Sequence, residues 1–161
     1  MGASGWSYRV RYEGSLGETL RAAQQEVIGS GKYVWPWADL DPDELADEGG
    51  LTRPRDLDEL AAAKQVQEFW AVGTHSILDV ERIWGPDDPF EQAAIRPLAE
   101  DETVQVFGTA TPTTADFERA HEPGASELLE DLLGPRWSGR CVVIVEGDRP
   151  AEVYFWGWSG D

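Results

Sequence analysis

Two apolar runs near the end of the sequence constrain the fold most strongly. CVVIV, residues 141–145, is a continuous apolar run typical of a central strand, and VYFWGW, residues 153–158, follows after the linker EGDRPAE. Because this linker is short and rich in turn residues, the two runs predict a C-terminal β-hairpin. Both faces of the second run are apolar, with Tyr154, Trp156 and Trp158 on one and Val153, Phe155 and Gly157 on the other. The sheet is therefore either covered on both sides or exposes one aromatic face.

The rest of the chain shows short helix and strand patterns in irregular order. WSYRVRY, residues 6–12, alternates like a half-buried strand, and Ser15 with Glu18 forms a capping box for a helix that ends at 29–31. The same reasoning predicts three further strands, at 32–37, 74–84 and 103–108. It also predicts a helix over 57–70, a short helix that starts at 88 and ends before 97, a helix capped by Thr113 or Thr114, and a helix capped by Ser126. Without regular βαβ spacing, this order predicts an α+β fold with a mixed or mainly antiparallel sheet, in one globular domain, 1–161.

Residues 38–55 form an acidic, loop-rich insertion. Asp41 suits the N-cap, Pro42 suits the first helical position and Glu44 completes a capping box, so one short helix is expected there. Between positions 38 and 60 the chain has nine acidic residues and two arginines. Six of these acids precede the first glycine of the insertion: Asp39, Asp41, Asp43, Glu44, Asp47 and Glu48.

The charge of the whole chain excludes several classes of partner. Thirteen lysines and arginines against 31 acidic residues give a net charge of −18, whereas about 2–8 in magnitude is normal for a small domain. Lys32 and Lys64 are the only lysines. Such a chain should repel nucleic acid and anionic lipid, so neither is expected as a partner. A basic protein is the natural complement, although acidity that serves only solubility is an equal alternative.

Cysteine content and hydropathy predict the compartment. Cys141 is the only cysteine, so no intrachain disulfide forms, which fits a reducing environment. The first residues show no apolar leader pattern, and no apolar stretch approaches the ~20 residues that span a bilayer. The sequence therefore predicts a soluble cytoplasmic protein, without cofactors and without a membrane segment.

Titratable side chains offer one arrangement for chemistry. In a strand over 74–84, His75, Asp79 and Glu81 share one face, where they would act as acid and base or hold a metal. Ile77 interrupts the row and metal-ligand spacing is absent elsewhere, so a solvated strand face is favoured and no metal is predicted. His121 is expected to cap a helix C-terminus. If His75, Asp79 and Glu81 form a site, Arg9 or His121 is expected near them.

Other reactive residues have simpler explanations. Cys141 begins the most apolar strand and is expected to be a buried, inert thiol. Arg9 and Arg11 alternate on the first strand, where they would clamp an anion or, as is favoured, neutralise neighbouring carboxylates.

Tryptophan is the remaining unusual feature, with eight in the chain. The sequences WPW, 35–37, and FWGW, 155–158, would serve as core, as an interface with a partner or a second copy, or as a ligand pocket. The residues concerned are Trp35, Trp37, Trp156 and Trp158.

Three functional hypotheses follow. The first is an acidic, non-catalytic protein of the immunity or neutraliser type that docks on a basic protein through the six acids of the insertion and these tryptophans. The second is a small enzyme that uses His75, Asp79 and Glu81. The third is a small-molecule binder with a Trp-lined pocket. The first is preferred, because the sequence contains no convincing catalytic constellation.

Overall fold

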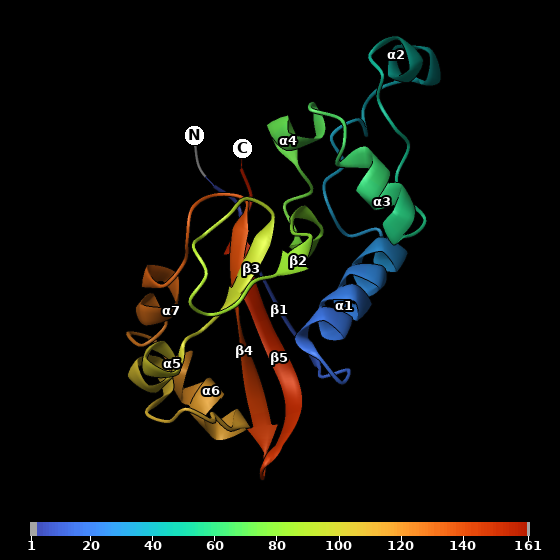
Figure 1. Cartoon of the computed structure of the whole chain (residues 1–161). Coiled ribbons are helices and arrows are strands. Elements are labelled where there is room, and N and C mark those ends of the chain that lie inside the picture. The colour runs from blue at the N-terminus through green and yellow to red at the C-terminus, as the bar shows by residue number, and fades with distance from the viewer. Residues whose placement is uncertain (1–2, 161) are drawn as a thin grey trace.

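A computed structural model of the chain describes residues 3–160 (Figure 1). Its elements, in chain order, are β1 Gly5–Arg11, α1 Leu16–Ser30, α2 Pro42–Asp47, α3 Leu57–Ala63, α4 Phe69–Val72, the 3₁₀ turn η1 Ile77–Asp79, β2 Arg82–Ile83, β3 Ala94–Pro97, α5 Glu100–Phe107, α6 Thr114–Ala120, α7 Glu127–Asp131, β4 Ser138–Glu146 and β5 Arg149–Trp158. None of the helices in this part of the chain is long and apolar enough to cross a membrane.

The strands form one mixed sheet in the order β1-β5-β4-β3-β2. β5 pairs antiparallel with both β1 and β4, whereas β3 lies parallel to β4 and β2. The predicted α+β fold and C-terminal hairpin are confirmed, with register running from Ser138 opposite Trp158 to Glu146 opposite Arg149. The aromatic C-terminal run is therefore an interior strand with a partner on each side.

Helices cover both faces of the sheet (Figure 1). Phe155 points into a cluster built with α1, α3, α4 and η1, whereas its neighbour Trp156 points into a second cluster built with α5, α6 and α7. Both side chains are buried, at 0% and 4% exposed. Of the two arrangements that the apolar strand predicts, the sheet covered on both sides is the one formed.

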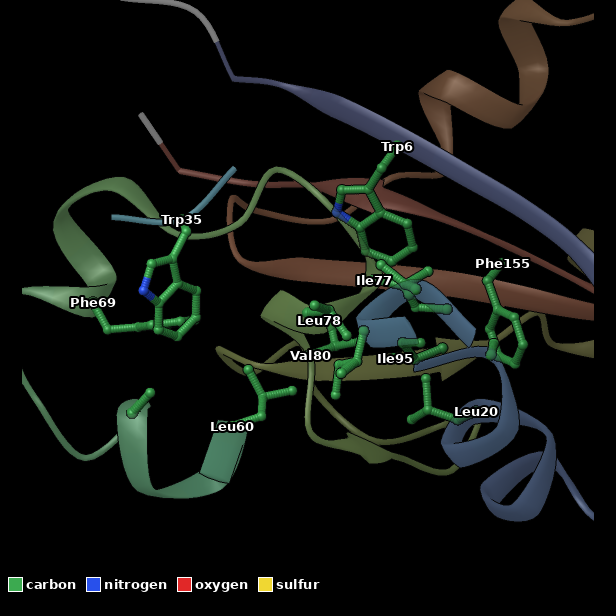
Figure 2. Close-up of a cluster of buried hydrophobic side chains, with 14 of the residues drawn as sticks. Trp6, Leu20, Trp35, Leu60, Phe69, Ile77, Leu78, Val80, Ile95 and Phe155 are labelled. Atoms are coloured by element: carbon green, nitrogen blue, oxygen red, sulfur yellow. The ribbon is translucent and has the colours of Figure 1, made fainter. Parts of the chain in front are cut away.

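The larger cluster lies between the sheet and the 16–80 region (Figure 2). Ile77, Leu78 and Val80 are completely buried there and lie among residues from α1, α3 and the sheet. Aromatic rings extend the cluster toward the acidic insertion, with the Trp35 ring 6.1 Å from the Phe69 ring. The Trp35 indole N–H also donates to the Leu51 carbonyl at 2.8 Å, so this aromatic packing connects the insertion to the fold.

Several predicted caps are confirmed. Ser15 accepts from the Glu18 N–H at 3.1 Å and starts α1, and Asp41 accepts from the N–H groups of residues 43 and 44 at the start of α2. Thr113 accepts from the Asp116 N–H at the start of α6, while Ser126 precedes α7 without a side-chain cap. The helix predicted over 57–70 is broken into α3 and α4.

The prediction of a strand over residues 74–84 is wrong, because most of this segment is not extended. Ser76 accepts from the Leu78 N–H at 3.2 Å and Asp79 accepts from the Thr74 N–H at 2.7 Å, so local side-chain bonds bend the chain into η1. Only Arg82–Ile83 pairs as a strand. Alternation therefore fails, and Ile77 and Leu78, adjacent in sequence, are both buried.

Three further predictions are wrong for different reasons. The strand at 103–108 is α5, because Thr103 and Phe107, one helical turn apart, are both buried while Val104 is 44% exposed. The helix expected from 88 to before 97 is instead a loop followed by β3, which pairs on both sides. The strand at 32–37 is a turn-rich segment outside the sheet, attached through the Val34 N–H and the Thr74 carbonyl at 2.9 Å.

Candidate functional site

The most distinctive surface is the insertion over residues 38–55, hereafter the acidic lobe. Helix α2 of the lobe lies beyond α3 and α4, away from the sheet (Figure 1). None of the residues of α2 is buried. All six acids predicted to bind a partner are exposed: Asp39, Asp41, Asp43, Glu44, Asp47 and Glu48. No lysine or arginine lies among them in the sequence.

These six charges are not neutralised by the fold. Within residues 3–160, none of the six carboxylates forms an ion pair. The two arginines that follow in the lobe are engaged elsewhere, since Arg53 donates to the Tyr33 carbonyl at 3.2 Å and Arg55 pairs with Glu59. The lobe therefore presents a concentrated negative field.

Buried tryptophans hold the base of the lobe. Trp35 and Trp37 are 3% and 6% exposed, their rings 5.5 Å apart, and the Trp35 indole N–H donates to the Leu51 carbonyl at 2.8 Å. A Cβ at Gly50 would lie 2.7 Å from Leu45 Cδ1 and 2.8 Å from the Trp37 ring, so the chain passes tightly over them. The two indoles serve as core and are not available as a contact surface.

Three exposed apolar side chains adjoin this base. Val34, Leu51 and Val72 are 40%, 36% and 37% exposed. The Leu51 carbonyl accepts from Trp35, and the Val34 N–H donates to Thr74, two residues after Val72. Leu51 belongs to the lobe and Val34 precedes it, so exposed apolar side chains and the six acids both occur in this part of the chain, and protein interfaces combine these two features.

The predicted His/carboxylate row does not form, because the segment is not a strand. Asp79 is buried and accepts hydrogen bonds from Thr74 and, at 2.6 Å, from the Ser159 hydroxyl, while Glu81 is exposed. His75 has a φ of 53° and its Nδ1 lies 3.3 Å from the Ser4 hydroxyl. Burial raises the pKa of the Asp79 carboxyl, opposed by these hydrogen bonds. Asp79 therefore fastens the C-terminal end of β5 to η1.

The other candidate residues have structural partners. His121 is the C-cap of α6, as predicted, and its Nδ1 lies 2.8 Å from the Phe117 carbonyl oxygen. Arg9 neutralises Glu152 at 2.6 Å. Burial raises the pKa of the Cys141 thiol to about 12, so this residue is inert, as expected.

The four predicted tryptophans do not line one pocket. Trp35 and Trp37 belong to the larger cluster, whereas Trp156 lies in the other and donates to the Leu129 carbonyl at 2.9 Å. Trp158 is half-buried and, with Trp156, lines a mainly apolar groove of about 320 Å³ beside α7.

A second pocket contains a buried amine that the sequence interpretation did not single out. Lys64, the C-cap of α3, is 6% exposed and its Nζ donates to the Val80 carbonyl oxygen at 2.8 Å. The pocket, about 350 Å³, is formed by α1, α3 and the segment before β2. Burial lowers the pKa of Lys64 from its usual 10.5 to about 8, although Glu81 and Asp79 favour the charged form. The sequence signal for this burial is helical spacing, since Leu57, Leu60 and Lys64 lie on the same face of α3.

No group of three or more His, Cys, Asp or Glu side chains in residues 3–160 is arranged to hold a metal ion. Comparison of the chain with protein-family models, with curated proteins and with solved structures finds no match.

Proposed function

We propose that this protein is an acidic, non-catalytic binding protein of the immunity or neutraliser type, which docks on a basic protein through the acidic lobe and inhibits it. One observation carries the proposal: six exposed carboxylates occupy one small lobe, without an ion pair in residues 3–160. A partner with a basic face would supply the missing counter-charges. Opposite fields would also speed the encounter and reject acidic competitors.

The surroundings of the lobe support a docking role. Leu51 lies in the lobe and Val34 just before it, both as exposed apolar side chains, and contacts of such groups add affinity where exposed ion pairs contribute little. Trp35 and Trp37 are buried at the base of the lobe, and this packing restricts the free lobe, so the lobe would lose less conformational entropy on binding.

Charge argues against a second copy as the occupant of this surface. Two chains that each carry −18 would repel each other, so we assign the lobe to a different, cationic protein, such as a nuclease or another basic toxin. The single cysteine is a free thiol, and we place the encounter in the cytoplasm.

The test compares two variants of equal charge. The lobe variant carries Asp43→Lys, Asp47→Lys and Glu48→Lys, and it spares the two acids that cap α2. The control variant carries Glu118→Lys, Glu122→Lys and Glu127→Lys, all exposed residues in and between α6 and α7. Each variant has a net charge of −12, because three reversals change −18 by six.

Proteins that the unmodified protein captures from the host extract are purified without selection for charge, and their association rates are measured with each variant at low salt. We expect the lobe variant to associate at least about tenfold more slowly, with a weaker salt dependence, and the control to remain near the unmodified protein. Equal rates for the two variants would refute the lobe as the docking surface. A captured partner without a basic face would refute charge complementarity.

A further inference from the structure

The Lys64 pocket has a defined polar end. The Val80 carbonyl oxygen accepts two hydrogen bonds, from Lys64 Nζ at 2.8 Å and from Gln24 Nε2 at 2.7 Å, and Gln24 also donates to the Ile77 carbonyl at 3.1 Å. All of these except Ile77 line the pocket. A carbonyl oxygen has two lone pairs, so these two donors occupy Val80 fully.

The hydrogen bonding at Lys64 suits a neutral amine. Val80 is the only hydrogen-bond acceptor of Nζ among residues 3–160. An ammonium group has three N–H donors, so the charged form needs two further acceptors that residues 3–160 do not supply. A neutral amine that donates to Val80 keeps its lone pair available as a nucleophile.

Charged groups from each surrounding element lie at the pocket. Arg21 comes from α1, Asp58 from α3 and Glu81 from the residue before β2, and all three line the pocket. Asp79, on η1, also acts electrostatically on Lys64. Arg21 supplies a positive charge for an anionic group, and the exposed Glu81 carboxylate supplies a group that relays protons between the pocket and water.

We propose that this pocket binds a small carbonyl compound that carries an anionic group, and that Lys64 joins it covalently as an imine. The Lys64 nitrogen lone pair forms a bond to the carbonyl carbon, and the carbonyl π electrons move to oxygen, which takes a proton. The nitrogen then loses a proton through Glu81. Glu81 supplies a second proton to the oxygen, which leaves as water as the C–O bond breaks and nitrogen forms the C=N bond, and the iminium nitrogen then returns its remaining N–H proton to Glu81. One amine and one carbonyl thus give one imine and one water, and Arg21 holds the anionic group.

The size and chemistry of the pocket support this class of ligand. A volume of about 350 Å³ accommodates a molecule of a few carbon atoms. Leu57, Leu60 and Ala61 supply the apolar part of the lining, against which the carbon atoms of the ligand would pack. The site is independent of the acidic lobe and requires no turnover.

The test uses the two lysines of the chain as each other's control. The full-length protein is incubated at pH 8 with glyoxylate and sodium cyanoborohydride, which reduces an imine to a stable secondary amine, and peptide mapping locates the adduct. Lys32 is exposed and serves as the reference. An ordinary lysine, with a pKa near 10.4, is only about 0.4% neutral at pH 8, so we expect Lys64 to be labelled at least about tenfold faster than Lys32.

Two further measurements separate a binding site from mere reactivity. Labelling of Lys64 should saturate with glyoxylate concentration, and Arg21→Gln should slow glyoxylate severalfold but leave acetaldehyde, which is uncharged, unchanged. Equal or slower labelling of Lys64 than of Lys32 would overturn the proposal. If the rate of Lys64 labelling rises linearly with glyoxylate concentration, or is the same in Arg21→Gln as in the unmodified protein, the pocket is not a site for anionic carbonyl compounds.

Discussion

The buried amine of Lys64 makes the stability of this protein depend on pH in an unusual direction. Its pKa is lowered by burial from 10.5 to about 8. Between these two values the unfolded chain binds a proton that the folded chain has released. The free energy of unfolding therefore rises with pH across this window. Below about pH 8 both states are protonated, and the folded state bears the full cost of the buried charge.

The magnitude follows from the pKa difference. At about 1.4 kcal/mol per pH unit, lowering the pKa from 10.5 to about 8 corresponds to about 3 kcal/mol. Lys64 is 6% exposed, so solvent screening reduces this figure little. Lys64→Met keeps an unbranched side chain and removes the amine, while Gln24 still donates to the Val80 carbonyl.

The assay is urea unfolding of the unmodified protein and Lys64→Met between pH 7 and 10.5. The difference in unfolding free energy should move by about 3 kcal/mol in favour of the unmodified protein as pH rises. Burial raises the pKa values of Tyr8 and Tyr154, but these tyrosines titrate alike in both proteins, so their contributions cancel in the difference of unfolding free energies. Lys32→Met is the exposed control. A difference that does not change with pH would refute the desolvation of Lys64.

Three substitutions test other parts of the fold by urea unfolding. Gly157→Ala should destabilise the protein by more than about 2 kcal/mol, because the new Cβ would lie 2.6 Å from a backbone oxygen of β4, and a smaller loss would show that the strands can separate there. Ser159→Ala should cost about 1–3 kcal/mol by removing a donor to the buried Asp79, and an unchanged midpoint would show that this bond does not fasten the chain end. Glu102→Ala should cost about 3 kcal/mol because Arg140, 1% exposed, loses its carboxylate partner, whereas stability equal to the unmodified protein would mean that the carbonyl contacts of the guanidinium suffice.

Two kinds of prediction that rest on neighbouring residues are confirmed, namely helix N-caps and the C-terminal hairpin. The Ser15 N-cap of α1 and the Asp41/Glu44 capping box of α2 are local, since the cap and its partner lie three residues apart, although the reciprocal Glu18 bond predicted at α1 does not form. The C-terminal hairpin follows from two long β-rich runs and a short linker. These elements are predictable because their interactions are contained in one segment of chain.

Predictions for short apolar segments are wrong where tertiary packing decides. The Thr103–Phe107 segment has β-branched residues, yet it is a helix in which Thr103 and Phe107, one turn apart, are both buried and Phe107 packs in the cluster with Val142 and Ile144 of β4. The Ile77–Leu78 pair is buried on both sides by α1 and the sheet, so it shows no strand alternation.

The sequence by itself determined the hairpin, the caps, the acidity of the 38–55 insertion and the excess of aromatic residues, because each of these is a property of composition or of residues close in the chain. Only the tertiary structure decided that Trp35, Trp37 and Trp156 are core and that Lys64 is a buried amine. Burial depends on what segments far apart in sequence place around a side chain, and Lys64 is enclosed by Gln24 and Val80, which are 40 and 16 residues away. Helical spacing places Lys64 on the buried face of α3, but no local pattern specifies the distant groups that enclose its amine.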